Sequence, residues 1–297
     1  MPPVVETPWV EPPSLRTPAL VSRVLATPLR LWSVRDLAAA SLARELRGRV
    51  AGTVLGPLWP LAQPLTLLVV YGFVFTTLLA QRLPGADGGT AWGAYMLVGT
   101  LAWTGLAESL TRSTSALVEG RELVRKLAYP IELLPLVPAL ASIVLLTAGA
   151  VMVVALGWAT GLVPISPGLW ALPLLAGLQA AFAVGLGWAL AGLNACLRDV
   201  GQLLPLVLTA AMLATPVFWV ASAELVPGLA PFLPYVEASP LTHVVDGWRA
   251  VLLGGLEGVP APAPTEALAA LAPWSCGALL LGRLVLARLE PLVLDEV

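Results

Sequence analysis

The sequence has few charged residues for its length. Only 11% of its 297 residues are Asp, Glu, Lys or Arg, whereas a soluble domain normally carries about 25%. Too little charge is present to cover a globule of this size with a water-facing surface, so lipid has to solvate much of it. The formal net charge of −2 gives no indication of a nucleic-acid partner.

Histidine, cysteine and lysine are nearly absent. His243 is the only histidine, which excludes a multi-histidine metal cluster within one chain, and Cys196 and Cys276 lie singly in apolar stretches. The only lysine, Lys126, does not follow a glycine-rich phosphate-binding loop of the GxxxxGK[ST] kind. We therefore expect no metal site and no cofactor on this chain, and we expect it to be neither an enzyme nor an ATPase by itself.

Long apolar runs dominate what is present. A bilayer core of about 30 Å needs about 20 apolar residues in a helix, and six stretches qualify. We predict an all-α integral membrane protein whose transmembrane domain covers 57–290, with spans at about 58–80, 94–118, 133–160, 168–195, 203–221 and 266–286.

The segment 222–258 lies between the fifth and sixth expected spans. It mixes four prolines with short apolar runs, so it is too broken to span and too apolar for a free loop. Short re-entrant helices on the outer side fit best, provided that protein shields their polar backbone.

The basic residues orient the chain. With the N-terminus inside, the inner segments hold twelve of the 16 basic residues, Arg112 and Arg283 lie near inner helix ends, and only Arg82 and Arg249 are outside. A split of 12 + 2 against 2 predicts that both termini are cytoplasmic. We expect the bacterial cytoplasmic membrane as the location.

Two segments precede the first span. Residues 1–32 are rich in proline and polar groups and predict a disordered or loosely docked cytoplasmic tail. Residues 33–56 predict an amphipathic interface helix, with apolar Ala39, Leu42, Ala43, Leu46, Val50 and Val54 on one side. It serves as a membrane-surface anchor or has a role in a complex. Its charged residues are Arg35, Asp36, Arg44, Glu45, Arg47 and Arg49.

Charges inside a span are costly and hence informative. Glu108 and Arg112 lie four apart in the second span, in the favourable order for an intrahelical pair; they neutralise each other or face a hydrated pathway. Trp103 and Trp188 lie deep in their spans and are packing residues or aromatic platforms for sugar rings. All four are candidates for a translocation pathway. The small residues Gly177, Ala181, Gly185 and Ala189 predict a close helix–helix contact.

Three ordered stretches resemble one family. They are RDLAAASLARELRGRVAGTVLGPLWPLAQPL at 35–65, LVEGRELVRKLAYPIELLPLVPAL at 117–140, and LRDVGQLLPLVL at 197–208 followed by TPVFW at 215–219 and SPLTHVVDGWRAVLL at 239–253. In this order they resemble the permease subunits of ABC-2-type polysaccharide exporters, which move O-antigen, capsular, teichoic-acid or related lipid-linked glycans. The resemblance covers roughly residues 30–290.

The resemblance implies six helices, a homodimer and a separate ATPase, in two copies, that carries the ATP and Mg. It implies that the ATPase docks against the interface helix and a coupling segment formed by Glu119, Gly120, Arg121, Glu122, Leu123, Val124, Arg125, Lys126, Tyr129 and Pro130. Arg198 and Asp199 would form a second inner turn.

Other functions remain open at this point. A drug, antibiotic or lipid efflux permease of the same superfamily is the nearer alternative. A membrane-embedded glycan or lipid transferase is another, but the outer acidic residues do not cluster as such an enzyme requires.

The orientation can be tested by cysteine labelling. With Cys196 and Cys276 replaced by alanine, cysteine at Asp87 should react with an impermeant thiol reagent added outside intact cells, whereas cysteine at Asp199 should react only after the cells are opened. The opposite pattern would show that the arginine distribution does not set the orientation.

Overall fold

In the computed structural model, the described part of the chain is built of helices. It covers residues 17–51, 89–127, 129–159, 165–223 and 230–296, with single positions at 62, 66, 70, 73, 161 and 228. No strand occurs within these ranges, which agrees with the predicted all-α class. Apart from those single positions, the first expected span and residues 52–56 of the expected interface helix lie outside the described residues.

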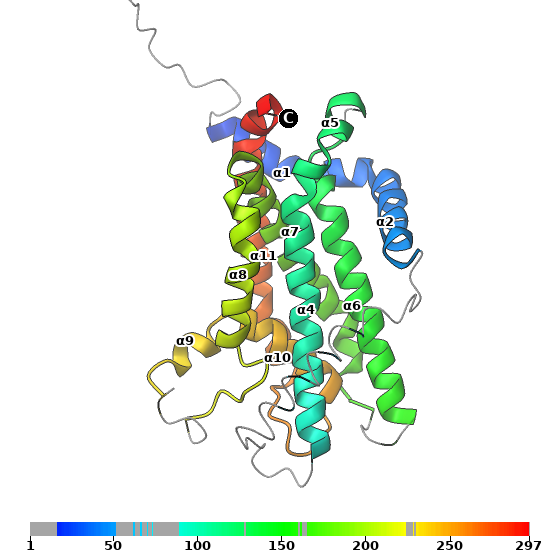
Figure 1. Cartoon of the computed structure of the whole chain (residues 1–297), viewed down its shortest axis with the longest axis vertical. Coiled ribbons are helices and arrows are strands. Elements are labelled where there is room, and N and C mark those ends of the chain that lie inside the picture. The colour runs from blue at the N-terminus through cyan, green and yellow to red at the C-terminus, as the bar shows by residue number, and fades with distance from the viewer. Residues whose placement is uncertain are drawn as a thin grey trace, which may run out of the picture.

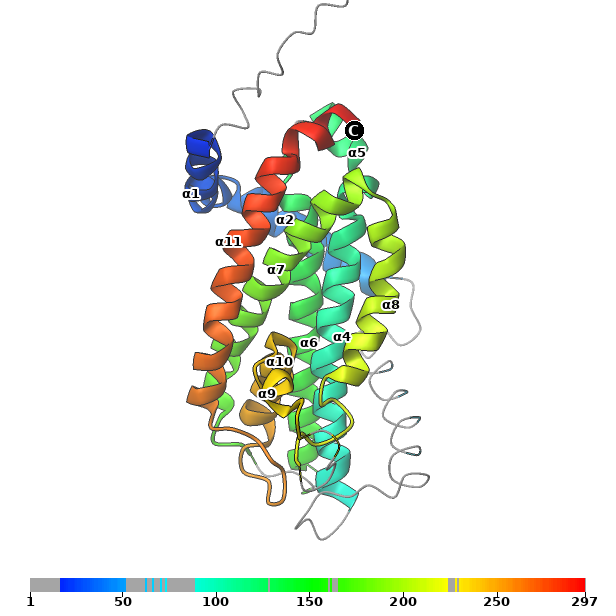
Figure 2. The same ribbon diagram turned by 90° about the vertical axis from the view of Figure 1, so that its left-hand side faces the viewer.

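Among the described residues, the helices that run along the long axis (Figures 1 and 2) are α4 (Gly89–Glu119), α6 (Leu133–Ala159), α7 (Leu172–Cys196), α8 (Asp199–Ala214) and α11 (Pro264–Glu296). Near one end lie α1 (Thr17–Ser33), α2 (Arg35–Val50), α5 (Arg121–Leu127) and the end of α11. We call this the α5 end. The opposite end, which we call the α10 end, holds α9 (Leu233–Glu237) and α10 (Pro240–Leu253).

Within the described residues, three helices are long and apolar enough to cross a membrane, namely Leu133–Ala159, Leu169–Cys196 and Pro264–Val293. They match the third, fourth and sixth expected spans, the fourth opening with the 3₁₀ turn η4 (Leu169–Ala171). The second expected span is α4. The six-span topology itself stays a prediction.

The fifth expected span is shorter than the sequence suggests. Residues 203–221 were expected, but α8 begins at Asp199 and ends at Ala214. Thr215 is extended, with ψ of 142°, because the residue before a proline avoids the helical region and Pro216 follows. The predicted outer segment does contain two short helices, α9 and α10; whether they re-enter the membrane stays a prediction.

The bundle is centred on α7, which packs along α11, α4 and α6. A Cβ built on Gly185 would overlap the backbone of Ala278, and one built on Gly282 would overlap the Gly185 carbonyl. Glycine at both positions lets the α7 and α11 backbones touch. The predicted small-residue face therefore contacts a helix of the same chain, although Gly177 at its start lies exposed in open space.

The N-terminal segments differ from the sequence expectation. Residues 17–33 form α1 rather than a disordered or loosely docked tail, and Thr27 of α1 is buried against α11. In α2, Ala39 and Ala43 of the predicted apolar side are exposed, so whether this side faces lipid stays a prediction. Ser41 and Arg49 face the bundle, where they form hydrogen bonds with polar groups of α4, α6 and Tyr129. These hydrogen bonds contribute more than the contacts that small alanines would make there.

The contact between α7 and α11 predicts a position-specific effect of one methyl group. Gly185→Ala should lower the free energy of unfolding by about 1–3 kcal/mol, because the added carbon overlaps backbone that cannot move aside. Gly177→Ala, eight residues earlier on the same helix, is the matched control and should be neutral. Unfolding of detergent-solubilised protein in increasing SDS measures both. Equal stability of the two variants would contradict the close contact.

Candidate functional site

A buried ion pair at the α5 end joins segments that are far apart in the sequence. Arg283 of α11, only 2% exposed, donates from Nη2 to Glu132 Oε1 at 2.9 Å and from Nε to Thr27 Oγ1 at 2.8 Å. Glu132 immediately precedes α6, and Thr27 belongs to α1. A buried guanidinium needs such partners, so this contact fixes α1 and the start of α6 on α11.

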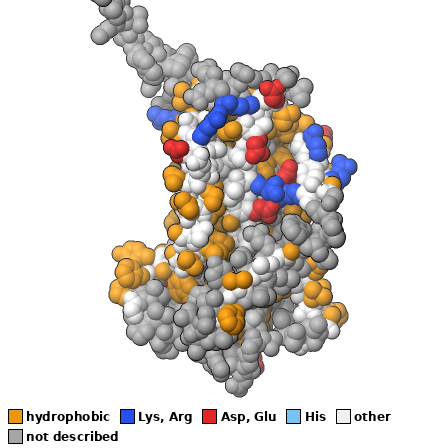
Figure 3. Space-filling model, viewed as in Figure 1, with side chains coloured by type: hydrophobic (Ala, Val, Ile, Leu, Met, Phe, Trp, Pro, Cys, Tyr) orange, Lys and Arg blue, Asp and Glu red, His pale blue; other side chains and the backbone are white. Residues whose placement is uncertain are grey.

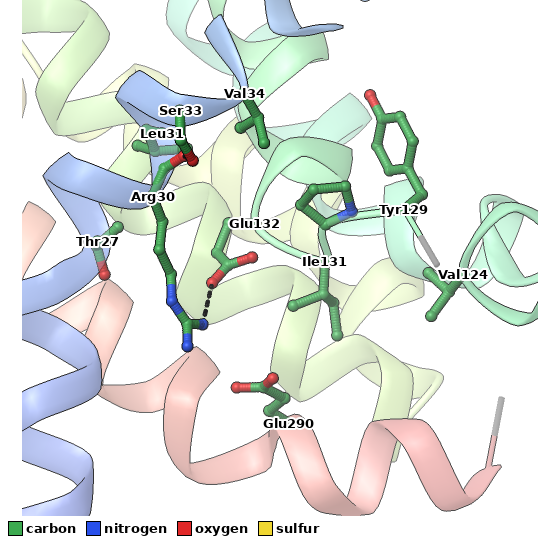
Figure 4. Close-up of a pocket in the computed structure, with 11 residues that line it drawn as sticks. Thr27, Arg30, Leu31, Ser33, Val34, Val124, Tyr129, Ile131, Glu132 and Glu290 are labelled. Carbon is green, nitrogen blue, oxygen red and sulfur yellow. Dashed lines mark hydrogen bonds and ion pairs between the residues drawn. The ribbon is translucent and has the colours of Figure 1, made fainter. Parts of the chain in front are cut away.

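A cavity of about 410 Å³ opens beside this pair (Figure 4). Arg30 reaches across it from α1, with Nη1 3.8 Å from Glu132 Oε1, and Glu290 of α11 faces it from the other side. Its wall includes members of the expected coupling segment: Val124, Tyr129 and Pro130. A displacement of α5 would therefore change the shape of this cavity.

The expected coupling segment forms a turn and a short projecting helix. Glu119 ends α4, and Gly120 makes the turn to α5; a Cβ on Gly120 would lie 2.7 Å from Leu134 Cδ2, so glycine lets this turn pack on α6. On α5, Glu122 and Leu123 are exposed, Leu123 by 40%. Arg121 is partly buried. The side chains of Arg125 and Lys126 lie outside the described part.

Three hydrogen bonds anchor the two turns at the α5 end on the bundle. Tyr129 donates its hydroxyl to Ser41 Oγ of α2 at 2.9 Å. Asn194 of α7 accepts from the Gly201 amide at 2.8 Å and donates to the Thr114 carbonyl of α4 at 2.9 Å. Asn194 thereby ties the second inner turn to α4, while Arg198 and Asp199 of that turn are exposed.

A second charged cluster lies where α2 meets the bundle. The nearly buried Arg49 donates to Glu45 Oε1 at 2.9 Å, to Glu108 Oε1 at 3.2 Å and to Ser142 Oγ at 3.0 Å. Arg112 Nε donates to Glu108 Oε1 at 2.9 Å. The intrahelical pair that the sequence suggested is thus present, and Arg49 extends it to α2 and α6. Glu108 and Arg112 remain partly exposed.

The other interface-helix residues have few contacts with the bundle. The exposed ones are Arg35, Asp36, Arg44 and Arg47. Arg44 Nη2 lies 3.4 Å from Ser41 Oγ, and Arg35 lies 5.0 Å from the centre of the Trp32 ring.

The two deep tryptophans are both buried inside the single chain. Trp188 donates Nε1–H to the Glu132 carbonyl at 2.9 Å, and Trp103 packs in a cluster with Tyr95, Met212 and Phe218. Their role as sugar platforms stays a prediction, since neither ring is open to the surface of this chain.

A third polar cluster lies at the α10 end. Arg249 of α10 is fully buried, donates to the Pro216 carbonyl at 2.7 Å and the Val217 carbonyl at 2.9 Å, and lies 3.4 Å from the centre of the Tyr95 ring. Asp246 Oδ1 accepts from Arg249 Nη1 at 3.2 Å. Burial raises the pKa of the Asp246 carboxyl, and the Arg249 charge opposes this shift.

Sequence reasoning missed several of these residues. Glu132 and Arg283 both lie at the expected inner ends of predicted spans. The sequence shows that each is a charged residue near a span end, but it does not show that they form a pair. Their pairing spans 151 positions, so no local pattern shows it. Ser41 carried no signal, because isolated serines are common in interfacial segments. The Pro216 and Val217 carbonyls that accept from Arg249 belong to the backbone, which side-chain patterns do not report. In Figure 3 the described charged side chains of the visible face gather toward the α5 end.

The Glu132–Arg283 pair predicts a strong effect of removing one charge. Glu132→Gln should lower the free energy of unfolding by about 3–5 kcal/mol, because the Arg283 charge stays buried. Asp36→Asn is the matched control: it removes one of a pair with Arg35 that is exposed to water, and should leave stability unchanged. SDS unfolding of the solubilised protein compares them. A Glu132→Gln variant as stable as Asp36→Asn would contradict the buried pair.

The comparisons with known proteins agree with this architecture. The "O-antigen export system permease protein RfbA" of Myxococcus xanthus is 28% identical over 192 residues, 64% of this chain and 70% of that protein. Two proteins of the same name from Klebsiella pneumoniae are each 22% identical, over 74% of this chain and 82% and 81% of their own lengths. The model of the ABC-2 type transporter family matches residues 37–253. Because this match covers well over half of the sequence, the chain belongs to the ABC-2 type transporter family.

Proposed function

We propose that this chain is the permease subunit of an exporter that moves a lipid-linked polysaccharide across the bacterial cytoplasmic membrane. A homodimer of the chain would form the passage, and two copies of a separate ATPase, which bind the ATP and Mg, would drive it. The observation that carries the proposal is the similarity, over about two thirds to three quarters of the chain, to proteins named as O-antigen export permeases.

The coupling segment is proposed as the ATPase contact. Its helix α5 extends beyond the bundle (Figure 1) and presents the exposed apolar side chain of Leu123 beside the exposed Glu122. A short helix with an apolar residue among charges suits a groove on a partner protein, where the apolar residue is buried and the charges select the partner. Arg198 and Asp199 would make the second contact.

A series of hydrogen bonds connects this segment to the expected passage. Tyr129 follows α5 and bonds to Ser41 of α2, and Arg49 on the same helix bonds to Glu108 and Ser142. A movement of α5 would therefore pull on α2 and reach the charged cluster of α4 and α6. In the proposal Glu108 and Arg112 face a hydrated passage on their exposed sides.

The surface of α8 supports pairing with a second copy. It packs on α4 through one stripe that includes Leu204 and Met212, which leaves Leu203, Leu206, Val207 and Leu213 more than half exposed. A span of this kind gains from a helical neighbour as well as from lipid.

Transport in proteoliposomes tests the function. The vesicles would contain this chain with the ATPase subunit encoded in the same genome, and the probe would be a radiolabelled polyprenyl-diphosphate-linked oligosaccharide. We expect probe movement only with ATP and both subunits. The Arg121→Glu/Arg125→Glu variant should insert and dimerise normally, yet lose most ATPase association and transport, because two charges of the segment proposed to bind the ATPase change sign. Arg288→Glu, an exposed reversal at the same end on α11, should keep both.

Other outcomes of these assays would distinguish the alternative functions from the proposed one. ATP-driven movement of a fluorescent drug cation without movement of the glycan probe would favour an efflux permease. A chemically altered probe formed without ATP would favour a transferase. Full transport by the Arg121→Glu/Arg125→Glu variant would show that this segment does not couple the two subunits, while leaving the polysaccharide proposal intact.

A further inference from the structure

Helix α1 has two faces of opposite character. On one face Thr27 is buried and bonded to Arg283, and Leu31 packs on the core cluster that includes Leu286. On the other face Leu25, Leu29 and Trp32 are 71%, 75% and 69% exposed. The spacing of i, i+4 and i+7 places these three side chains in one row along the helix. The described chain leaves this apolar row uncovered.

The row is next to positive charge. Arg30 and Arg35 are both more than half exposed, and the Arg35 guanidinium lies 5.0 Å from the centre of the Trp32 ring. Residues 12–35 contain no Asp or Glu. A helix with apolar side chains on one face, arginines at its edge and a tryptophan is typical of segments that lie in the plane of a membrane interface.

The position of α1 fits such a surface. It lies beside the half of α11 nearest the α5 end, and Figure 2 shows it on the outer flank of the bundle. On α11 the exposed leucines Leu280, Leu281 and Leu284 mark a side that faces lipid if α11 spans the membrane. The apolar row therefore lies near the end of a lipid-facing helix, at the level where a bilayer surface would be.

We propose that α1 is a lipid-binding helix that rests on the anionic surface of the membrane in which the bundle sits. Leu25, Leu29 and Trp32 enter the acyl-chain boundary, and Arg30 and Arg35 contact anionic headgroups. Thr27 and Arg283 fasten the helix to α11. This helix precedes residues 37–253, which the family model matches. The proposal rests on the membrane location and not on what is exported.

A partner protein is a less suitable occupant of this face. An ATPase that docks on α5 would approach from beyond the end of the bundle, whereas α1 lies on its flank (Figure 2). Arg30 and Arg35 stay more than half exposed beside Glu132 and Asp36, so both guanidinium groups can also contact an anionic lipid surface, to which each arginine adds binding strength.

Spin-label accessibility along α1 tests the proposal in the full chain. With Cys196 and Cys276 replaced by alanine, single nitroxide labels at positions 25, 26, 29, 32 and 33 would be measured in nanodiscs of phosphatidylcholine with one third phosphatidylglycerol. We expect collision with oxygen, which concentrates in lipid, to peak at 25, 29 and 32. Collision with a water-soluble nickel chelate should be higher at 26 and 33, which lie off the row.

A second measurement varies the charge of the lipids and of the helix. Replacing phosphatidylglycerol by phosphatidylcholine, or introducing Arg30→Gln and Arg35→Gln, should reduce the ratio of membrane-bound to free label at position 29. The expected reduction is about fivefold for each arginine removed. Water-like accessibility at all five positions would overturn the proposal. Protection of the row that appears only after the ATPase is added would also overturn it, in favour of a protein partner. If the label accessibilities do not change when phosphatidylglycerol is replaced by phosphatidylcholine, the proposed role of the arginines is wrong.

Discussion

A guanidinium can be buried in a bundle of apolar helices only where acceptors surround it, because an uncompensated buried charge costs several kcal/mol. Arg49, Arg249 and Arg283 all meet this condition with partners from other segments. Each arginine therefore fixes the relative position of elements that the chain alone does not join. Arg283 holds α1 and the start of α6 on α11, Arg49 holds α2 on α4 and α6, and Arg249 holds α10 on α4 and the residues after α8.

The clusters around Arg49, Arg249 and Arg283 give the two ends of the bundle different character. The α5 end carries two of them, together with the cavity, the short helix α5 and the second inner turn. Contacts there run from α5 through Tyr129 and Ser41 into α2. At the α10 end, Arg249 combines carbonyl acceptors with an aromatic ring in a site closed to solvent. The first arrangement has exposed parts that a partner can reach, whereas the second is enclosed and holds α10 against α4 and the residues after α8.

The same logic explains why α1 and α2 pack as they do. Within a lipid environment an apolar side chain gains little from facing another helix, because the lipid tails are equally apolar. A polar side chain gains much, because its hydrogen bonds are otherwise unmade. Ser41 and Arg49 of α2, and Thr27 of α1, accordingly face protein, whereas Leu25 and Leu29 of α1 are left outside.

The sequence by itself determined the class of protein, the helical segments and the family. Apolar runs predict membrane helices from local composition alone. The predicted bounds of α4, α6, α7 and α11 therefore lie within a few residues of the observed ones, except at the end of α11, which runs to Glu296. The four-residue spacing of Glu108 and Arg112 was likewise enough to predict their pair. The tertiary structure alone decided which side of α2 faces the bundle, that residues 17–33 form a helix, and that Glu132 meets Arg283. These depend on partners more than a hundred positions away or on polar contacts that outweigh the apolar pattern. Local periodicity contains no information about which distant group will neutralise a buried charge.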